Sequence, residues 1–170
     1  MTLTDAGALV ALLDADDPYH TACVTATQHL PAGPLLTTWV CFTEAMYLLG
    51  SVGGYRYQAA LWSLRATGRL MLHDLTPAEA DRMAALMAQY QDTPMDLADA
   101  SLVVVAESRT LRRVFTTDSD FYVRTARHWK WCRDHAAFSS TRRTEPRTGA
   151  DRLQLRLRSA SPTLPAAAHR

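Results

Sequence analysis

Four acidic residues, far apart in the chain, have the types and local settings expected of a metal-dependent site: Asp5, Glu44, Asp99 and Asp118. If folding brings them together, their charges repel, by about 4 kcal/mol for a pair 4 Å apart at an effective dielectric of 20. A hard divalent cation removes this penalty, and Mg²⁺ or Mn²⁺ suits carboxylate oxygens. Such an ion can lower the pKa of a bound water and stabilise charge that develops on a phosphate. The acids therefore predict metal-assisted hydrolysis.

The local sequence around each acid sharpens this prediction. Asp5 and Asp118 each follow a predicted strand, and open α/β sheets bind ligands at the carboxyl ends of their strands. Asp96 and Asp99 share a face in the first turn of a predicted helix, where the helix dipole favours negative charge. Asp96 also suits a purely structural N-cap. Glu44 lies in the otherwise apolar stretch WVCFTEAMYLL, so its carboxylate must reach solvent, pair with an arginine or find a cation.

The elements that must position these acids alternate between strands and helices. Strands are predicted at 2–5, 35–39, 69–75 and 112–117. Helices are predicted at 6–15, 18–30, 40–50, 55–67, 77–90 and 96–108. Two helix starts are marked most clearly: Thr76, Pro77 and Glu79 form a capping box, and Asp16 or Asp17 followed by Pro18 suggests a cap. The segment 128–138 suggests a last edge strand or a short helix. This alternation predicts an α/β fold with a short parallel sheet between helical layers.

Length and charge divide the chain into one domain and a tail. The 170 residues are enough for one domain with a real core and too few for two ordinary ones. Residues 1–120 carry 14 acidic and 7 basic side chains, a net −7, whereas residues 121–170 carry 11 basic and 3 acidic, a net +8. We predict a folded domain over 1–135 and a basic, mostly disordered tail over 136–170.

Several function classes lack support in the sequence. The chain has no G-x-x-x-x-G-K-[ST] or G-x-G-x-x-G phosphate loop and no G-x-S-x-G elbow. Its histidines and cysteines form no zinc or redox motif. A phosphatase would need an acid where Gly7 stands, and a receiver domain needs a lysine earlier than Lys130. No apolar run approaches the length of a membrane span, and the start lacks a secretory signal, so we expect a cytoplasmic protein.

Four segments, in order, resemble a PIN domain, particularly the toxin of VapBC-type toxin–antitoxin pairs: TDAGALVALLD, TTWVCFTEAMYLL, PMDLADASLVVVAE and VFTTDSDF. The resemblance covers about residues 3–124. It implies a three-layer α/β/α fold, magnesium-dependent endoribonuclease activity, a homodimer and a cognate antitoxin. It also implies that Asp5 and Asp99 are the principal metal ligands, that Glu44 and Asp118 complete the site, and that Asp96 and Asp120 are secondary acids. The long arginine-rich tail departs from the family pattern.

Other polar and aromatic residues fit two interpretations. Three polar residues, Thr116, Thr117 and Ser119, could hydrogen-bond phosphate or metal-bound water, but turn polarity explains them about equally well. The aromatic residues Tyr19, Trp39, Tyr47 and Trp62 are more typical of a core or a dimer interface than of base-stacking platforms. A catalytically inert PIN-like module that binds RNA or a protein is the alternative to the toxin function.

Overall fold

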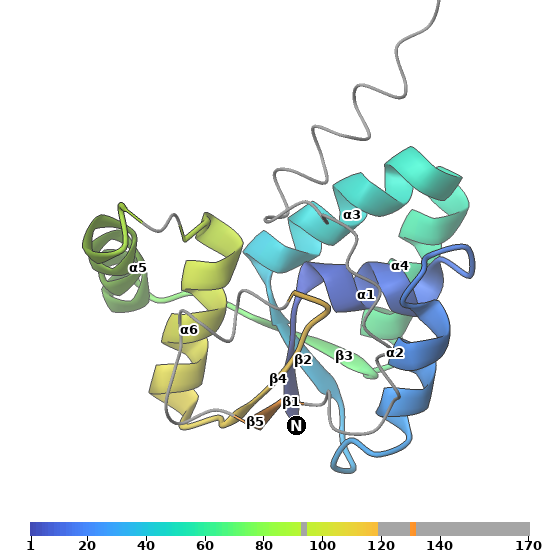
Figure 1. Ribbon diagram of the computed structural model, residues 1–170, viewed down its shortest axis with the longest axis horizontal. Coiled ribbons are helices and arrows are strands. Elements are labelled where there is room, and N and C mark those ends of the chain that lie inside the picture. Colours follow the sequence, from blue (N-terminus) through green and yellow to red (C-terminus); the bar gives the residue numbers. More distant parts are fainter. Residues whose placement is uncertain (93–94, 119–129, 132–170) are drawn as a thin grey trace, which may run out of the picture. The chain divides into compact units, whose positions relative to one another are not determined.

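The computed structural model describes residues 1–92, 95–118 and 130–131. Its centre is a parallel sheet of five short strands in the order β3-β2-β1-β4-β5 (Figure 1). The strands span β1 (Thr2–Thr4), β2 (Leu35–Thr38), β3 (Leu70–His73), β4 (Arg113–Phe115) and β5 (Lys130–Trp131). The predicted edge strand within 128–138 is thus confirmed. The parallel α/β sheet agrees with the fold class predicted from the alternating pattern.

The strand order places a topological switch point beside β1. From β1 the chain moves outward to β2 and β3, then returns to form β4 on the other side of β1. Ligands of open α/β sheets bind outside the carboxyl ends of the strands at such a reversal. The region following β1 and β4 is therefore where the fold favours a site.

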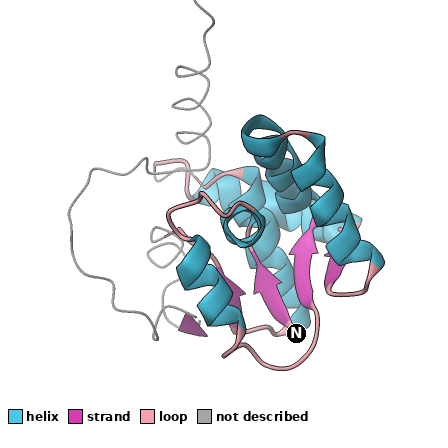
Figure 2. Ribbon diagram, turned by 90° about the vertical axis from the view of Figure 1, so that its right-hand side faces the viewer, coloured by secondary structure: helices cyan, strands magenta, loops and turns pink. Residues whose placement is uncertain are grey.

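Helices form a layer on each side of the sheet. They are α1 (Ala6–Leu13), α2 (His20–Thr27), α3 (Trp39–Gly53), α4 (Tyr55–Ala66), α5 (Pro77–Gln89) and α6 (Leu97–Arg109). The pair α5 and α6 lies on one side, while α1, α2 and α4 lie on the other, and α3 packs against both α1 and α4 (Figures 1 and 2). Right-handed crossovers between parallel strands produce this two-sided cover.

The core is built from the sheet and from one largely enclosed helix. All residues from Ala98 to Ala106 of α6 are buried, which explains why this stretch is apolar after its first turn. Leu3 and Leu36 pack in the sheet at 0% and 1% exposure. Burying one such leucine contributes roughly 1.5–3 kcal/mol, so these layers account for much of the folding free energy.

Most predicted boundaries agree with the structure, and the capping box of α5 is confirmed in both of its hydrogen bonds. The prediction that Pro18 opens a helix is wrong. Successive turns from Asp14 to His20, and an N–H of Tyr19 bound to the Asp17 carboxylate, occupy that segment before α2 begins. Helix α3 also runs further than predicted and ends where Gly54 adopts a φ of +65°, a conformation that favours glycine.

The chain divides into two units, Met1–Ser139 and Ser140–Arg170, the second of which lies outside the described residues. The predicted boundary at 135/136 and the predicted disorder of the tail fall there too, and both stay predictions. Among the described residues, no helix combines the length and apolar character needed to traverse a lipid bilayer.

Candidate active site

Asp5 sits at the switch point and is tied to two elements. It follows β1 and caps α1, because its carboxylate accepts a hydrogen bond of 2.6 Å from the Ala6 N–H. The other carboxylate oxygen accepts from the Thr116 hydroxyl at 2.9 Å, and the Asp5 N–H donates to the Phe115 carbonyl at the end of β4. The side chain is thus held in one orientation between β1 and β4.

The segment after β4 brings a second acid to the same place. The Thr116 hydroxyl that donates to Asp5 also accepts the Asp118 N–H at 2.9 Å. Burial raises the pKa of Asp5, and the negative charges of Asp118 and Asp96 raise it further, although the bonds from Thr116 and Ala6 oppose this. Asp118 and Asp96 therefore lie within electrostatic range of Asp5.

The first turn of α6 contributes two acids with different local roles. The Asp96 carboxylate accepts the Asp99 N–H at 2.8 Å, so its interpretation as an N-cap is confirmed. Asp99 is 8% exposed although it carries a charge. Capping does not explain a buried carboxylate at this position, whereas a charge partner or a bound cation would.

Helix α3 carries Glu44, the last of the four predicted metal ligands. Thr38 caps this helix through the Cys41 N–H, and its hydroxyl shares a 2.7 Å hydrogen bond with the Ser101 hydroxyl of α6. Burial raises the pKa of the Cys41 thiol, with further increases from the charge of Asp5 and, less strongly, of Glu44. Both carboxylates thus act on the same buried thiol, which lies one turn before Glu44 on α3.

Three hydroxyl residues of this region carry contacts that the sequence did not predict: Thr38, Ser101 and Thr116. Only Thr38 had a local signal, because a threonine directly before an apolar helix is typical of an N-cap. Thr117 and Asp118 are partly buried. The predicted residues Ser119 and Asp120 lie outside the described residues.

The donor set suits a hard cation in its chemistry. Within residues 1–92, 95–118 and 130–131, no group of three or more His, Cys, Asp or Glu side chains is arranged to hold a metal ion directly. Mg²⁺, however, commonly takes one or two carboxylates and fills its other positions with water. The carboxylate of Asp5 fits that requirement, because it is buried, is destabilised by the charges of Asp118 and Asp96, and lies beside the Thr116 hydroxyl.

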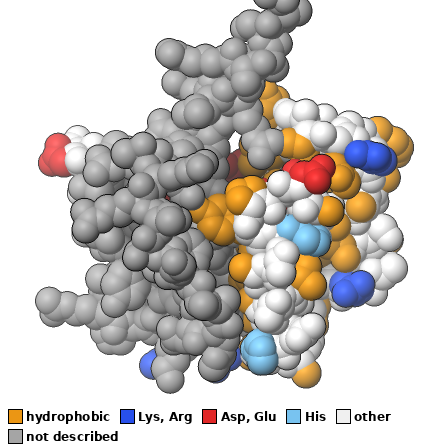
Figure 3. Space-filling view, turned by 45° about the vertical axis from the view of Figure 1, so that its right-hand side comes forward, with side chains coloured by type: hydrophobic (Ala, Val, Ile, Leu, Met, Phe, Trp, Pro, Cys, Tyr) orange, Lys and Arg blue, Asp and Glu red, His pale blue; other side chains and the backbone are white. Residues whose placement is uncertain are grey.

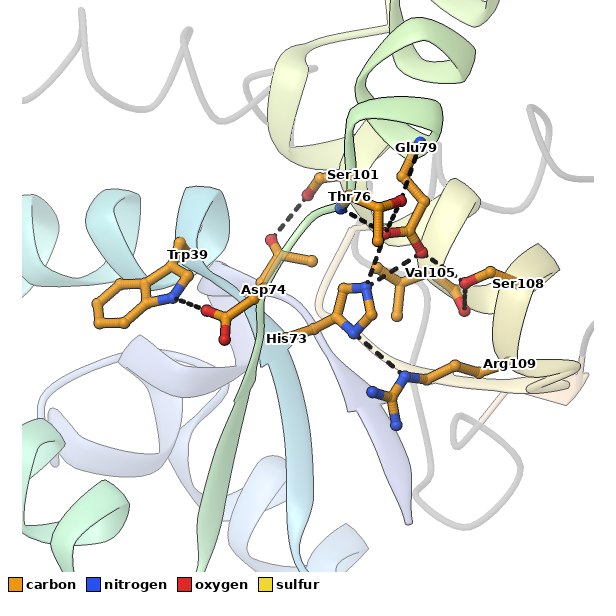
Figure 4. A network of polar contacts seen from close by, with 10 residues as sticks. Trp39, His73, Asp74, Thr76, Glu79, Ser101, Val105, Ser108 and Arg109 are labelled. Carbon is orange, nitrogen blue, oxygen red and sulfur yellow. Dashed lines mark hydrogen bonds and ion pairs between the residues drawn. The ribbon is translucent and has the colours of Figure 1, made fainter.

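A second polar cluster, which the sequence did not predict, lies at the carboxyl end of β3 (Figure 4). The Glu79 carboxylate accepts from the Ser108 hydroxyl at 2.7 Å, from the Thr76 N–H at 2.9 Å and from His73 Nε2 at 3.0 Å. Arg109 Nε donates to His73 Nδ1, which leaves the ring proton on Nε2, facing Glu79. Burial raises the pKa of Glu79, but these bonds outweigh it and lower the pKa to about 2.

Comparison of the sequence with known proteins identifies a matching family and a related ribonuclease. A family model for the PIN domain matches residues 2–126. Ribonuclease VapC26 of Mycobacterium tuberculosis is 30% identical over 116 residues, which are 68% of this chain and 85% of that protein.

Solved structures share the fold. VapC20 of Mycobacterium tuberculosis, described as a sarcin–ricin loop cleaving toxin, superposes with a TM-score of 0.67 at 17% identity and covers 72% of this chain and 94% of its own. A toxin–antitoxin complex from Klebsiella pneumoniae has a TM-score of 0.55 at 19% identity. The match covers 72% of this chain and 91% of the chain in that complex. With the family model spanning β1 to β4, α1 to α6 and all four acids, this chain belongs to the PIN-domain family, with VapC-type ribonucleases among its relatives.

Proposed function

We propose that this protein is a magnesium-dependent endoribonuclease and the toxin of a type II toxin–antitoxin pair. The observation that carries the proposal is the gathering of acids at the switch point, where burial, Asp118 and Asp96 all raise the pKa of Asp5. A fold that keeps like charges in a buried edge gives up stability there, and a divalent cation would recover it. Perturbed carboxylates of this kind mark functional sites.

In this proposal Asp5, Asp99, Glu44 and Asp118 form the Mg²⁺ site, with Mn²⁺ as a substitute. One or two of these carboxylates would bind the ion directly, and the others would reach it through its retained water molecules. When bound, the ion supplies an activated water and stabilises the charge that develops on the scissile phosphate. The chain's own contribution is positional. Thr116 and the Ala6 N–H orient the Asp5 carboxylate, so that its oxygens are placed before any ion arrives.

The remaining residues of the site support the four ligands. The bond between Thr38 and Ser101 ties the start of α3 to α6, and thereby the helix that carries Glu44 to the helix that carries Asp99. Asp96 and Asp120 serve as secondary acids. Thr117 and Ser119 contact phosphate or ordered water.

RNA is the proposed substrate because the relative VapC26 is named a ribonuclease. An antitoxin and a homodimer are the proposed protein partners, and the Klebsiella pneumoniae toxin–antitoxin complex supports the first of these. An acidic cluster attracts an arginine, which binds a carboxylate through two parallel hydrogen bonds, so the antitoxin would cover the site with a basic segment. Such a pair would act in the cytoplasm, where both RNA and antitoxin are present.

Cleavage of a defined RNA, with and without divalent metal, tests this function. The wild type should cleave with Mg²⁺ or Mn²⁺ and stop when EDTA removes the ion. Asp99→Asn should lose about 100-fold or more, because a bound metal supplies several kcal/mol of charge stabilisation. Asp81→Asn, the same chemical change at an exposed position of α5, should cleave like the wild type.

The alternative, an inert PIN-like module, predicts a different pattern. All three proteins would then bind RNA equally, and none would cleave it. Expression in cells adds a test of the toxin role: growth should stop with the wild type and resume when the cognate antitoxin is co-expressed. A chain that is harmless when expressed alone would contradict the toxin role while leaving the nuclease activity open to the first assay.

A further inference from the structure

Three neighbouring strands end in a row of residues that extends away from the acidic site. Asp5 follows β1, Trp39 follows β2 and Asp74 follows β3. These strands are adjacent and parallel, with Leu3 level with Leu36 and Thr38 level with His73. By this register Asp5 is level with Thr38, and Trp39, the next residue, is level with Asp74. Adjacent strands lie about 4.8 Å apart, so the backbone of Trp39 lies beside that of Asp74 and one residue beyond the level of Asp5.

The indole of Trp39 is fixed on two sides. Its Nε1–H donates to the Asp74 carboxylate at 2.8 Å, and the two side chains face each other in Figure 4. Its ring also meets the buried Phe42 ring edge to face, with centroids 5.7 Å apart at 77°. Despite these contacts, Trp39 is 39% exposed. The polar N–H of the indole is thus satisfied within the protein, and the partly exposed ring is oriented by Asp74 and Phe42.

The same chain contains a natural comparison in Trp62. It is also 39% exposed and also packs against Phe42, with centroids 4.8 Å apart. The Arg65 guanidinium, however, lies 5.9 Å from the centroid of the Trp62 ring, so this ring already has a cation as partner. Trp62 also belongs to α4, not to the row at the strand ends.

Exposed hydrophobic side chains are not rare on this protein. In the described part of the face drawn in Figure 3, hydrophobic side chains are spread over the surface among uncharged atoms, with a few charged side chains between them. Exposure by itself therefore does not mark Trp39, because single exposed apolar residues are ordinary on protein surfaces. What sets Trp39 apart is the fixed ring together with its place next to the acids.

We infer that Trp39 stacks on an unpaired base of the RNA next to the scissile phosphate. The inference rests on the proposed nuclease function. RNA is read mainly where bases are unstacked and can lie on aromatic rings. If the scissile phosphate binds at the carboxylates, the adjoining nucleotide would lie near the end of β2, where the Trp39 ring is located.

The ring also keeps a defined relation to the metal ligands. Trp39 is bonded directly to Thr38, whose hydroxyl binds Ser101, two residues beyond Asp99. Asp74 and Phe42 then set the ring plane relative to this anchored backbone. Trp39 is thus a substrate-positioning residue that would select where along the RNA the cut falls.

The test compares Trp39→Leu with Trp62→Leu, the same change at equal exposure. Affinity is measured by fluorescence anisotropy in EDTA, on an RNA oligonucleotide that the wild type cleaves and on copies of it that each lack one base. Trp39→Leu should weaken binding of the intact oligonucleotide about tenfold. This loss should vanish for one abasic position, because the base that the ring contacts is then already missing. Trp39→Phe should keep most of the affinity, and Trp62→Leu should match the wild type.

Other results would overturn the inference. If Trp39→Leu binds every oligonucleotide as the wild type does, while cleavage still depends on metal and Asp99, stacking is wrong and the nuclease function stands. If Trp39→Leu instead converts a dimer to a monomer in sedimentation, the ring contacts a second copy of the chain and the inference is also wrong. If the wild type cleaves no RNA with either metal, the proposed function itself fails, and this inference with it.

Discussion

Two acidic groups at the carboxyl edge of one sheet have opposite environments. Glu79, near the end of β3, is 9% exposed and receives hydrogen bonds from Ser108, Thr76 and His73. Asp5, at the end of β1, has fewer donors and two acidic neighbours. Burial acts to raise the pKa of both, yet the donors lower the pKa of Glu79 to about 2, whereas that of Asp5 stays raised.

The difference is the one expected between a structural carboxylate and a carboxylate of the proposed metal site. A fully bonded buried acid stabilises the fold and needs nothing more. A buried acid beside other acids costs stability, and proteins keep such arrangements mainly where function requires them. The number of hydrogen-bond donors around each carboxylate therefore distinguishes Glu79 from Asp5, which the residue type does not.

The largest expected effect comes from removing the negative charge of Asp5. Asp5→Asn should reduce RNA cleavage by about 100-fold or more, since a ligand of the metal is lost. Asparagine can still cap α1 through its one oxygen, but its amide then loses the hydrogen bond from the Thr116 hydroxyl. Relief of the repulsion from Asp118 and Asp96 opposes this loss, so the metal-free fold should be destabilised less than by Glu79→Gln. Cleavage kinetics and thermal unfolding in EDTA measure the two effects. Full activity in Asp5→Asn would remove this residue from the site.

Glu79→Gln should show the reverse pattern. The NH2 group of glutamine is itself a donor and cannot accept the hydrogen bonds that Ser108, Thr76 and His73 give to the carboxylate. We therefore expect a loss of about 1–3 kcal/mol in the free energy of unfolding. Cleavage by the folded protein should be unchanged. Urea unfolding measures the loss. Glu107→Gln is the matched control, because the Glu107 carboxylate pairs with Arg82 where both side chains are nearly half exposed, and such pairs contribute under about 1 kcal/mol. Equal losses in the two variants would contradict the special role of the buried network.

The smallest expected effect is on how the free energy of unfolding of the metal-free protein changes with pH. Glu79 and Asp5 should contribute to this change with opposite signs. The pKa of Glu79 is lowered on folding from 4.5 to about 2, so its stabilisation is present above pH 4.5 and is lost as pH falls toward 2. The pKa of Asp5 is raised above 3.8, so its contribution is greatest below pH 3.8 and is lost as pH rises through the folded value. Unfolding of wild type, Asp5→Asn and Glu79→Gln across pH 2–7 should show each slope disappear in its own variant. A slope that survives in the corresponding variant would assign it to another group.

What the sequence determined by itself is local. The alternation of strands and helices, the capping box at Thr76, the Asp96 cap and the acids at element ends follow from periodicity and from contacts between residues three or four apart. The second helix was misplaced for a local reason as well, because consecutive turns compete with helix formation where Asp and Pro cluster.

Only the tertiary structure decided which side chains meet across the sheet. The bond from Thr116 to Asp5 joins residues 111 positions apart, and the bond between Thr38 and Ser101 joins residues 63 apart. No periodicity encodes such pairs, since they depend on strand order and on how helices pack. The same holds for Trp39, which the sequence suggested as a core or interface residue. Its position beside Asp74 and in line with Asp5 follows from the order β3-β2-β1, which no local pattern in the sequence specifies.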